Sequence, residues 1–396
     1  MSPVGSRSRS RAVGAPPAVA GPVIPFTAAA HEHTEPAFDV TVTPTASSIS
    51  LGPFDVPAFG FLRHIFLQVD ATGGTIGAGV LHPDYPFNIF QSISLNDVNG
   101  APIFGPLDGY ATLWANILGA YAGGSSDPRT VPWFVGTINA SYPMRIPIEI
   151  SRHSGMGSLA NQNAAAAYKV NLTINPTTTM FTTAPTTPPN IRIRGFLEAW
   201  TLPNEVDVAG RKQAEVPYAH GTTQYYSQFI KTISVGANTI LLPRVGNLIR
   251  QIIIIARNAT ANLPRDDTVF PDPAVVAWDA RSLRNETQKY LIERLRQINP
   301  ILASVAGTPA VSGAGRDTGV FAYQFNTSNS GQAGDDEPTF WLPTVQSTRL
   351  EIDGSCATAG TVQVITNDVA PVEVLPPERF VEQSHSGQLA HPTQSR

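Results

Sequence analysis

Apolar and polar residues alternate along most of the chain, as they do in strands that bury one face of a sheet. In the first half this pattern predicts strands at 38–43, 48–51, 59–69, 87–95, 131–138, 144–150, 168–174 and 190–200. In the second half it predicts strands at 225–235, 239–242, 248–256, 274–278, 320–325, 339–342, 348–352 and 361–366. The chain is therefore expected to be all-β apart from a few helices.

Two stretches interrupt the alternation with apolar residues at helical spacing. The first covers 105–121, where Asp108 is placed to cap a helix. The second is predicted to run from Ser282, its capping residue, to Asn299, since Pro300 disfavours helical geometry at the residue before it. Its apolar stripe is expected to be buried and consists of Leu283, Leu291, Leu295 and Ile298. Its polar side is expected to be mostly exposed and carries Arg284, Lys289, Glu293 and Arg296.

Both halves follow one order, in which strands are followed by one helix and then by further strands. Three residue pairs share a separation of 186 positions, namely Pro57 and Pro243, Gly60 and Gly246, and Leu62 and Leu248. A long apolar strand follows each triplet, and alternate residues of these strands are expected to be buried. The sequence predicts two homologous β-sandwiches, at 37–203 and 222–375, joined by a linker at 204–221.

The two ends of the chain lack any apolar period. Residues 1–36 carry Arg7, Arg9 and Arg11 and have no acidic residue before Glu32, so they predict a flexible basic arm. This arm is either a disordered tail or a segment that contacts an anionic surface. Residues 376–396 predict a polar C-terminal tail.

Composition narrows the class of protein. The chain of 396 residues has 35 Pro, 32 Gly and only 14% charged residues, which indicates many turns and a surface that partners cover. The net charge of -4 gives no global reason to expect nucleic-acid binding. Cys356 is the one cysteine, which excludes an intramolecular disulfide. No apolar run reaches the roughly 18 residues of a membrane span, and we expect no signal peptide.

Four motifs suggest chemistry, and none is complete. His31 and His33 have the spacing of two metal ligands but lack a third fixed ligand. The acidic residues at 335–337 lack the spacing of a calcium loop, and the pair at 153–154 lacks the elbow of an activated serine. The glycines at 313–319 do not match a phosphate loop. The sequence therefore predicts no catalytic, cofactor or metal site.

The element order, the chain length and one sequence pattern together resemble a known family. The pattern runs from Arg281 through 319–323 to 348–352, as a charged helix, a Gly-aromatic strand and a final pair of strands. It is similar to the double jelly-roll major capsid proteins of tectivirus-type phages, which are tailless icosahedral viruses with an internal membrane and are related in fold to adenovirus hexon. The resemblance covers about Phe38 to Val374 and implies two tandem jelly rolls, each with one connecting helix, plus extended N- and C-terminal arms.

The resemblance also implies a function. A homotrimer of such chains would form a pseudo-hexagonal capsomer that tiles an icosahedral shell beside neighbouring capsomers and penton or minor capsid proteins. Arg7, Arg9 and Arg11 would then contact internal membrane lipid or the packaged genome, in a virion assembled in the host cytoplasm. This reading implies no enzymatic activity. The alternative is a lectin-like or receptor-binding spike module of two β-sandwiches, and an enzyme on a jelly-roll scaffold is a third hypothesis.

Overall fold

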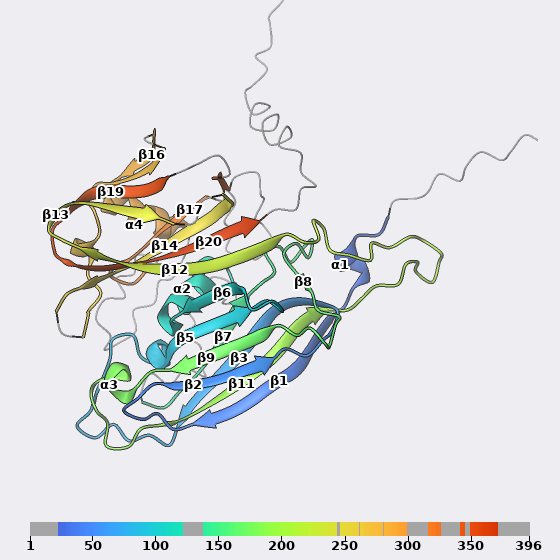
Figure 1. The fold of residues 1–396 in the computed structure, drawn as a ribbon, viewed down its shortest axis with the longest axis horizontal. Helices are drawn as coiled ribbons and strands as arrows, with labels where there is room; N and C mark the ends of the chain where they lie inside the picture. Colours follow the sequence, from blue (N-terminus) through green and yellow to red (C-terminus); the bar gives the residue numbers. More distant parts are fainter. Residues whose placement is uncertain are drawn as a thin grey trace, which may run out of the picture.

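The computed structural model describes residues 23–121, 138–243, 246–260, 262–279, 281–298, 316–325, 341–344 and 349–370. Within these ranges the chain forms two β-sandwiches that lie side by side (Figure 1). None of the helices in the described ranges is both long and apolar enough to cross a membrane.

The first sandwich packs two sheets of four long strands against each other. One sheet has the order β1-β11-β3-β7, with the bounds Glu32–Val42, Asn190–Trp200, Phe61–Thr72 and Ala140–Pro147. The other has the order β2-β9-β5-β6, with the bounds Ile49–Asp55, Lys169–Ile174, Phe90–Asn96 and Pro102–Leu107. Helix α2 (Gly109–Leu118) connects β6 to β7. The short elements are α1 (Phe26–Ala29), β4 (Val80–Leu81), η1 (Phe87–Ile89), β8 (Leu159–Ala160), α3 (Thr177–Met180) and β10 (Phe181–Thr183).

The second sandwich has the same architecture. Its first sheet has the order β12-β20-β14-β17, with the bounds Thr223–Ile233, Gly360–Ala370, Leu248–Asn258 and Val320–Gln324. Its second has the order β13-β19-β15-β16, with the bounds Gly236–Leu242, Leu350–Cys356, Ala274–Trp278 and Arg281–Glu286. Helix α4 (Gln288–Ile298) lies between β16 and β17 in the sequence, and the short elements are η3 (Asp267–Val269) and β18 (Leu342–Pro343).

The two sandwiches repeat each other strand for strand, which confirms the predicted duplication. The short strands β8 and β18 correspond as well, since β8 pairs with the start of β3 and β18 with the start of β14. β4 and β10, which pair with each other, have no counterpart among the described strands of the second sandwich. In each half the ladder skips one arginine, Arg63 between β3 and β11 and Arg250 between β14 and β20. These bulges are 187 positions apart, so the equivalence of Leu62 with Leu248 at 186 positions is wrong by one residue. The bulge, rather than the shared residue types, fixes the register.

The structure confirms the first predicted helix and shortens it. The Asp108 side chain accepts a hydrogen bond from the backbone N–H of Ala111 at 2.8 Å, as expected of a capping residue. Residues 105–107 belong to β6, so α2 begins only at Gly109.

The start predicted for the second helix is wrong. Residues 281–286 form β16, which pairs with β15, and α4 begins at Gln288. The backbone of this segment makes its hydrogen bonds to β15 and not within a helical turn. Leu283 therefore lies on a strand, where its side chain is 38% exposed. Within α4, Leu291 and Leu295 are buried as predicted. Lys289, Glu293 and Arg296 are exposed, Arg284 on β16 is half-buried, and the side chain of Ile298 lies outside the described residues.

The predicted end of the N-terminal arm is also wrong. Strand β1 already begins at Glu32, and Phe26 is buried edge-on against Phe61 and Trp200. A single aromatic residue without a periodic neighbour gives no pattern, yet a tertiary contact can bury it. Residues 204–221 form turns and isolated bridges, one of which joins Gln213 to Ile24.

The two jelly rolls meet along β6, α2 and β12 (Figure 1). β12 pairs with β6 in parallel at Tyr226 and Phe104, so one sheet continues from the first jelly roll into the second. Ile253 and Ile255 of β14 share a buried cluster with Trp114 of α2, whereas Ile252 and Ile254 lie in the core of the second jelly roll. β14 is thus buried on both faces, and the predicted alternate burial is wrong for it. In β3 the prediction holds only from Ile65 onward, since residues 61–65 are all buried.

Candidate functional site

Buried charged residues join the two jelly rolls. Asp84, in the loop before η1, accepts from Arg265 Nε at 2.9 Å and from Arg257 Nη1 at 2.6 Å. Arg265 Nη1 also lies 2.9 Å from Asp317 Oδ2, which accepts a 2.7 Å hydrogen bond from the Tyr110 hydroxyl of α2. Asp84 and Asp317 are 4% and 0% exposed, so these charges depend on one another for solvation.

The charge state of Asp84 follows from this geometry. Burial alone would raise the pKa of its carboxyl, but the Arg257 and Arg265 guanidinium groups hold that pKa below its usual value. The same carboxylate helps to keep the pKa of Arg257 raised against the effect of burial. The contact between the jelly rolls is therefore ionic at neutral pH.

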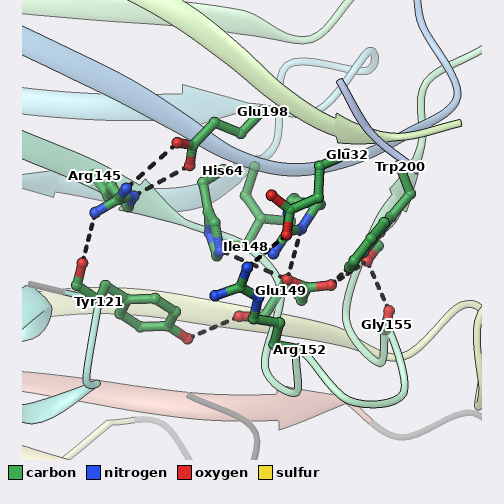
Figure 2. A network of polar contacts seen from close by, with 12 residues as sticks. Glu32, His64, Tyr121, Arg145, Ile148, Glu149, Arg152, Gly155, Glu198 and Trp200 are labelled. Atoms are coloured by element: carbon green, nitrogen blue, oxygen red, sulfur yellow. Dashed lines mark hydrogen bonds and ion pairs between the residues drawn. The ribbon is translucent and has the colours of Figure 1, made fainter. Parts of the chain in front are cut away.

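A second polar cluster surrounds Glu149 (Figure 2). Its Trp200 packs edge-on against Phe26 of α1. Glu149 Oε2 accepts from Arg63 Nε at 2.9 Å, and Oε1 accepts from Trp200 Nε1 at 2.5 Å. Arg63 also binds Glu32 of β1 at 3.0 Å, and Glu32 in turn binds Arg152 at 2.7 Å. Burial raises the pKa of Glu149, and the hydrogen bonds from Arg63 and Trp200 offset part of that shift.

His64 faces the same cluster in its neutral form. Its Nδ1 accepts a hydrogen bond from the Ile148 N–H at 3.3 Å, and its Nε2 lies 3.8 Å from Glu149 Oε2. Burial, together with Arg63 and two further arginines, holds the pKa of His64 well below 6.5. The carboxylate of Glu149 is too weak an opposing influence to keep this imidazole charged.

Tyr121 contacts Glu149 and Arg145 (Figure 2) and also binds the second jelly roll. Its hydroxyl donates to the Glu149 backbone carbonyl at 2.9 Å and accepts from Gln224 Nε2 of β12 at 2.9 Å. Arg145 Nη1 donates to the Tyr121 carbonyl at 2.8 Å and its Nε lies 3.1 Å from Glu198. One polar network therefore spans β1, β3, β7, β11 and the start of the second jelly roll.

A cavity of about 220 Å³ opens beside this network. Three arginines and three glutamates line it together with His64, and the glutamates are Glu32, Glu149 and Glu198. Each of these carboxylates already has an arginine partner. The arrangement favours a structural role in holding strand ends together.

The motifs singled out from the sequence do not converge on a site. Glu32 binds arginines, and the His33 ring stacks on Phe59 at 3.8 Å between centroids. His153 and Ser154 offer their backbone carbonyls to Thr27 and Tyr218. In the described part of the chain, no group of three or more His, Cys, Asp or Glu side chains could hold a metal ion.

Other predicted positions lie partly or wholly outside the described residues. These are Arg7, Arg9 and Arg11, the acidic residues at 335–337 and the glycines at 313–315. The end of that last segment is described, and its Arg316 makes two ion-pair contacts with Asp267, one of them at 2.8 Å. The buried network could not be predicted from the sequence, because its charged residues lie far apart along the chain and no local pattern shows which of them pair.

Solved structures of other proteins align with nearly the whole chain. The STIV MCP aligns over 89% of this chain and 98% of its own, with a TM-score of 0.55 and 14% identity. A chain from the atomic structure of Sulfolobus Turreted Icosahedral Virus aligns over 90% and 97%, with a TM-score of 0.59 and 13% identity. The PBCV-1 protein VP54, fitted into a reconstruction of the virophage Sputnik, aligns over 86% and 94%, with a TM-score of 0.51 and 10% identity.

The chain has a double jelly-roll fold. The likeness extends over nearly the whole length of the neighbouring chains, so both jelly rolls are matched and not one sandwich alone. At these identities the likeness establishes the fold. No protein-family model and no curated protein matches the sequence.

Proposed function

We propose that this double jelly-roll chain is a major capsid protein that trimerises into pseudo-hexagonal capsomers and tiles an icosahedral shell. The observation that carries the proposal is the pair of jelly rolls with one strand order, fixed side by side by β6, α2 and β12. Three such chains around a threefold axis would present six similar units, a shape that fills a surface through repeated contacts. The solved major capsid protein that matches both jelly rolls supports this proposal.

The function proposed in this way is structural and not catalytic. The polar groups of the Glu149 cluster bind one another, and the ionic contact at Asp84 joins the two jelly rolls. The proposed location is the shell of a virion assembled in the host cytoplasm. The proposed partners are two further copies, neighbouring capsomers, and penton or minor capsid proteins.

The basic segment has a separate proposed role. Arg7, Arg9 and Arg11 would lie on the inner face of the shell, where membrane lipid headgroups or packaged nucleic acid supply negative charge. Each basic residue near an anionic membrane contributes roughly 1 kcal/mol to binding. This contribution is too small to anchor a monomer, but it adds up over many copies in a shell.

The test is the assembly state of the purified chain. Light scattering coupled to size-exclusion chromatography should give three 42.2 kDa chains per particle, and electron microscopy of concentrated trimers should show hexagonal outlines and sheets or shells. Trimers that never form lateral contacts would favour the receptor-binding spike. A monomer at every concentration would overturn the capsid proposal.

A further inference from the structure

The contact between the two jelly rolls shows how one jelly roll of this chain packs on another. Helix α2 of the first jelly roll lies on the outer face of sheet β12-β20-β14-β17 of the second. Next to it, β6 pairs with the edge strand β12. By strand order, α4 and β16 of the second jelly roll are the equivalents of α2 and β6. Sheet β1-β11-β3-β7 of the first jelly roll is the equivalent of sheet β12-β20-β14-β17.

The equivalent elements are uncovered in the described part of the chain. β16 is an edge strand, and its residues are exposed or half-buried, including Leu283 at 38%. On α4, Tyr290 is 57% exposed. The sheet β1-β11-β3-β7 has an outer face of half-buried residues, here called the first-sheet face and formed by Phe66, Gln68, Arg145, Arg194 and Phe196.

Each helix resembles in polarity the sheet face that it covers or would cover: α2 and its sheet face are apolar, whereas α4 and the first-sheet face are mixed. α2 is buried at nine of its ten positions, and the face it covers presents Ile253, Ile255 and Ile365. The first-sheet face is mixed, since the Phe66 and Phe196 rings lie among arginines that pair with carboxylates. α4 is mixed in the same way, because it exposes Tyr290 among charged residues.

The two strand edges differ in charge, although Glu32 and Asp39 of β1 already bind arginines of the same copy, which leaves Glu35 for a partner. β1 carries Glu32, Glu35 and Asp39, whereas β16 carries Arg281 and Arg284 beside one acid, Glu286. Arg281 is exposed and Glu35 is half-buried, with His33 beside it at 3.6 Å. Opposite charges on adjacent strands favour pairing, and like charges oppose it.

We propose that α4 and β16 of one copy dock on the first-sheet face and the β1 edge of a second copy. This inference rests on the proposed trimer and names the surfaces that close it. Each chain would supply one such contact to the next, so that six jelly rolls alternate internal and intermolecular contacts around the ring. By analogy with β6 and β12, β16 of one copy would run parallel to β1 of its neighbour.

Cysteine cross-linking tests this contact directly, since Cys356 is buried and leaves no competing surface thiol among the described residues. A chain with Thr34→Cys on β1 and Leu283→Cys on β16 should form a disulfide-linked trimer on oxidation, because paired strands bring Cα atoms within about 4–7 Å. The control pairs Leu283→Cys with Val98→Cys, an exposed position in the β5–β6 turn, and should not form that trimer.

Charge reversal supplies an independent test by light scattering. With Thr34 opposite Leu283 in parallel strands, Glu35 lies beside Arg284. Arg284→Glu alone and Glu35→Arg alone should each lose most of the trimer at a concentration where the wild type is fully trimeric, and the double variant should regain it. If the wild type is trimeric but neither the cross-link nor the reversal has an effect, this inference is overturned and the capsid proposal stands. A wild type that remains monomeric overturns both.

Discussion

Two arginines occupy the same bulge in the two jelly rolls and serve different contacts. Arg63 lies 4.1 Å from the Trp200 ring and binds Glu149, within the first jelly roll. Arg250 lies 6.0 Å from the Tyr121 ring, so it reaches from the second jelly roll to the first. The bulge thus places a long cation at the end of each sheet, and the surrounding residues decide what it binds.

His64 makes stability depend on pH near neutrality. Because its pKa in the folded protein is below 6.5, the unfolded chain binds the proton more tightly below that pH, and stability falls as the pH falls. The loss should approach about 1.4 kcal/mol per pH unit until the folded pKa is reached. His64→Gln removes this titration, and urea unfolding between pH 7.5 and 5 measures the difference from wild type.

The comparison with His64→Gln isolates one group. Glu149 acts in the opposite direction, because its raised pKa favours the folded state as the pH falls, and it remains in both proteins. A wild-type and variant difference that stays constant across this pH range would show that His64 is not held neutral by burial.

Helix α4 illustrates how neighbouring elements compete for one sequence. The apolar stripe from Leu283 to Leu295 fits helical spacing throughout, yet the first part pairs with β15 as a strand. Only the second part, with Leu291 and Leu295, packs as a helix against the jelly roll. Strand pairing in the sheet outweighs the local period wherever an edge is available.

The burial of Leu291 can be measured. Leu291→Ala should lower the free energy of unfolding by about 2–5 kcal/mol, the usual cost of emptying a leucine site in a core. Leu241→Ala is the matched control, since Leu241 is 54% exposed on β13 of the same jelly roll. Denaturant melts in which both variants lose equally little stability would place Leu291 at the surface.

At the scale of the whole molecule, ionic and apolar contacts together fix the two jelly rolls. Asp84→Asn should lower the free energy of unfolding by about 3–5 kcal/mol at pH 7, because it leaves Arg257 and Arg265 buried with too little negative charge. The Asp84 pKa lies below 3.8, so its contribution is present above that pH and is lost as the pH falls through the folded value.

An exposed ion pair serves as the control for Asp84→Asn. Asp39 binds Arg192 at the surface of the first jelly roll, and Asp39→Asn should change stability little. Thermal unfolding of both variants measures the contrast. Equal effects would show that the contact at Asp84 is solvated and does not hold the jelly rolls together.

The basic arm is best tested by a deletion that spares the folded segment. Removing residues 1–22 should leave the trimer intact and reduce the yield or stability of particles, because the arm would act only in the shell. Removing residues 1–30 should also destabilise the subunit, since it takes Phe26 away from Phe61 and Trp200. Normal particles from the shorter deletion, counted by electron microscopy, would make the arm a passive tail.

A variant of full length separates charge from chain length. Arg7→Ser, Arg9→Ser and Arg11→Ser together remove the positive charge and keep every other residue of the segment. If charge is what the arm contributes, this triple variant should assemble as poorly as the deletion of 1–22. If the triple variant assembles normally and the deletion of 1–22 does not, the arm contributes through its other residues or its length and not through its charge.

The sequence by itself determined the β-rich character, the duplication and the helix α2. These depend on local alternation, on repeated element order and on a capping residue, Asp108, that binds within its own helix. Burial of Leu291 and Leu295 was also predictable, because helical spacing places them on one side.

Only the tertiary structure decided which charges are buried and which segments meet. Asp84 binds arginines that lie more than 170 positions away, and Glu149 binds Arg63 and Trp200 from separate strands. Phe26 and β16 were misassigned for the same reason, since a partner distant in sequence buries the first and pairs with the second. A local sequence pattern reflects the conformational and burial preference of each residue, whereas the pairing of strands in the folded chain determines which distant residues become its neighbours.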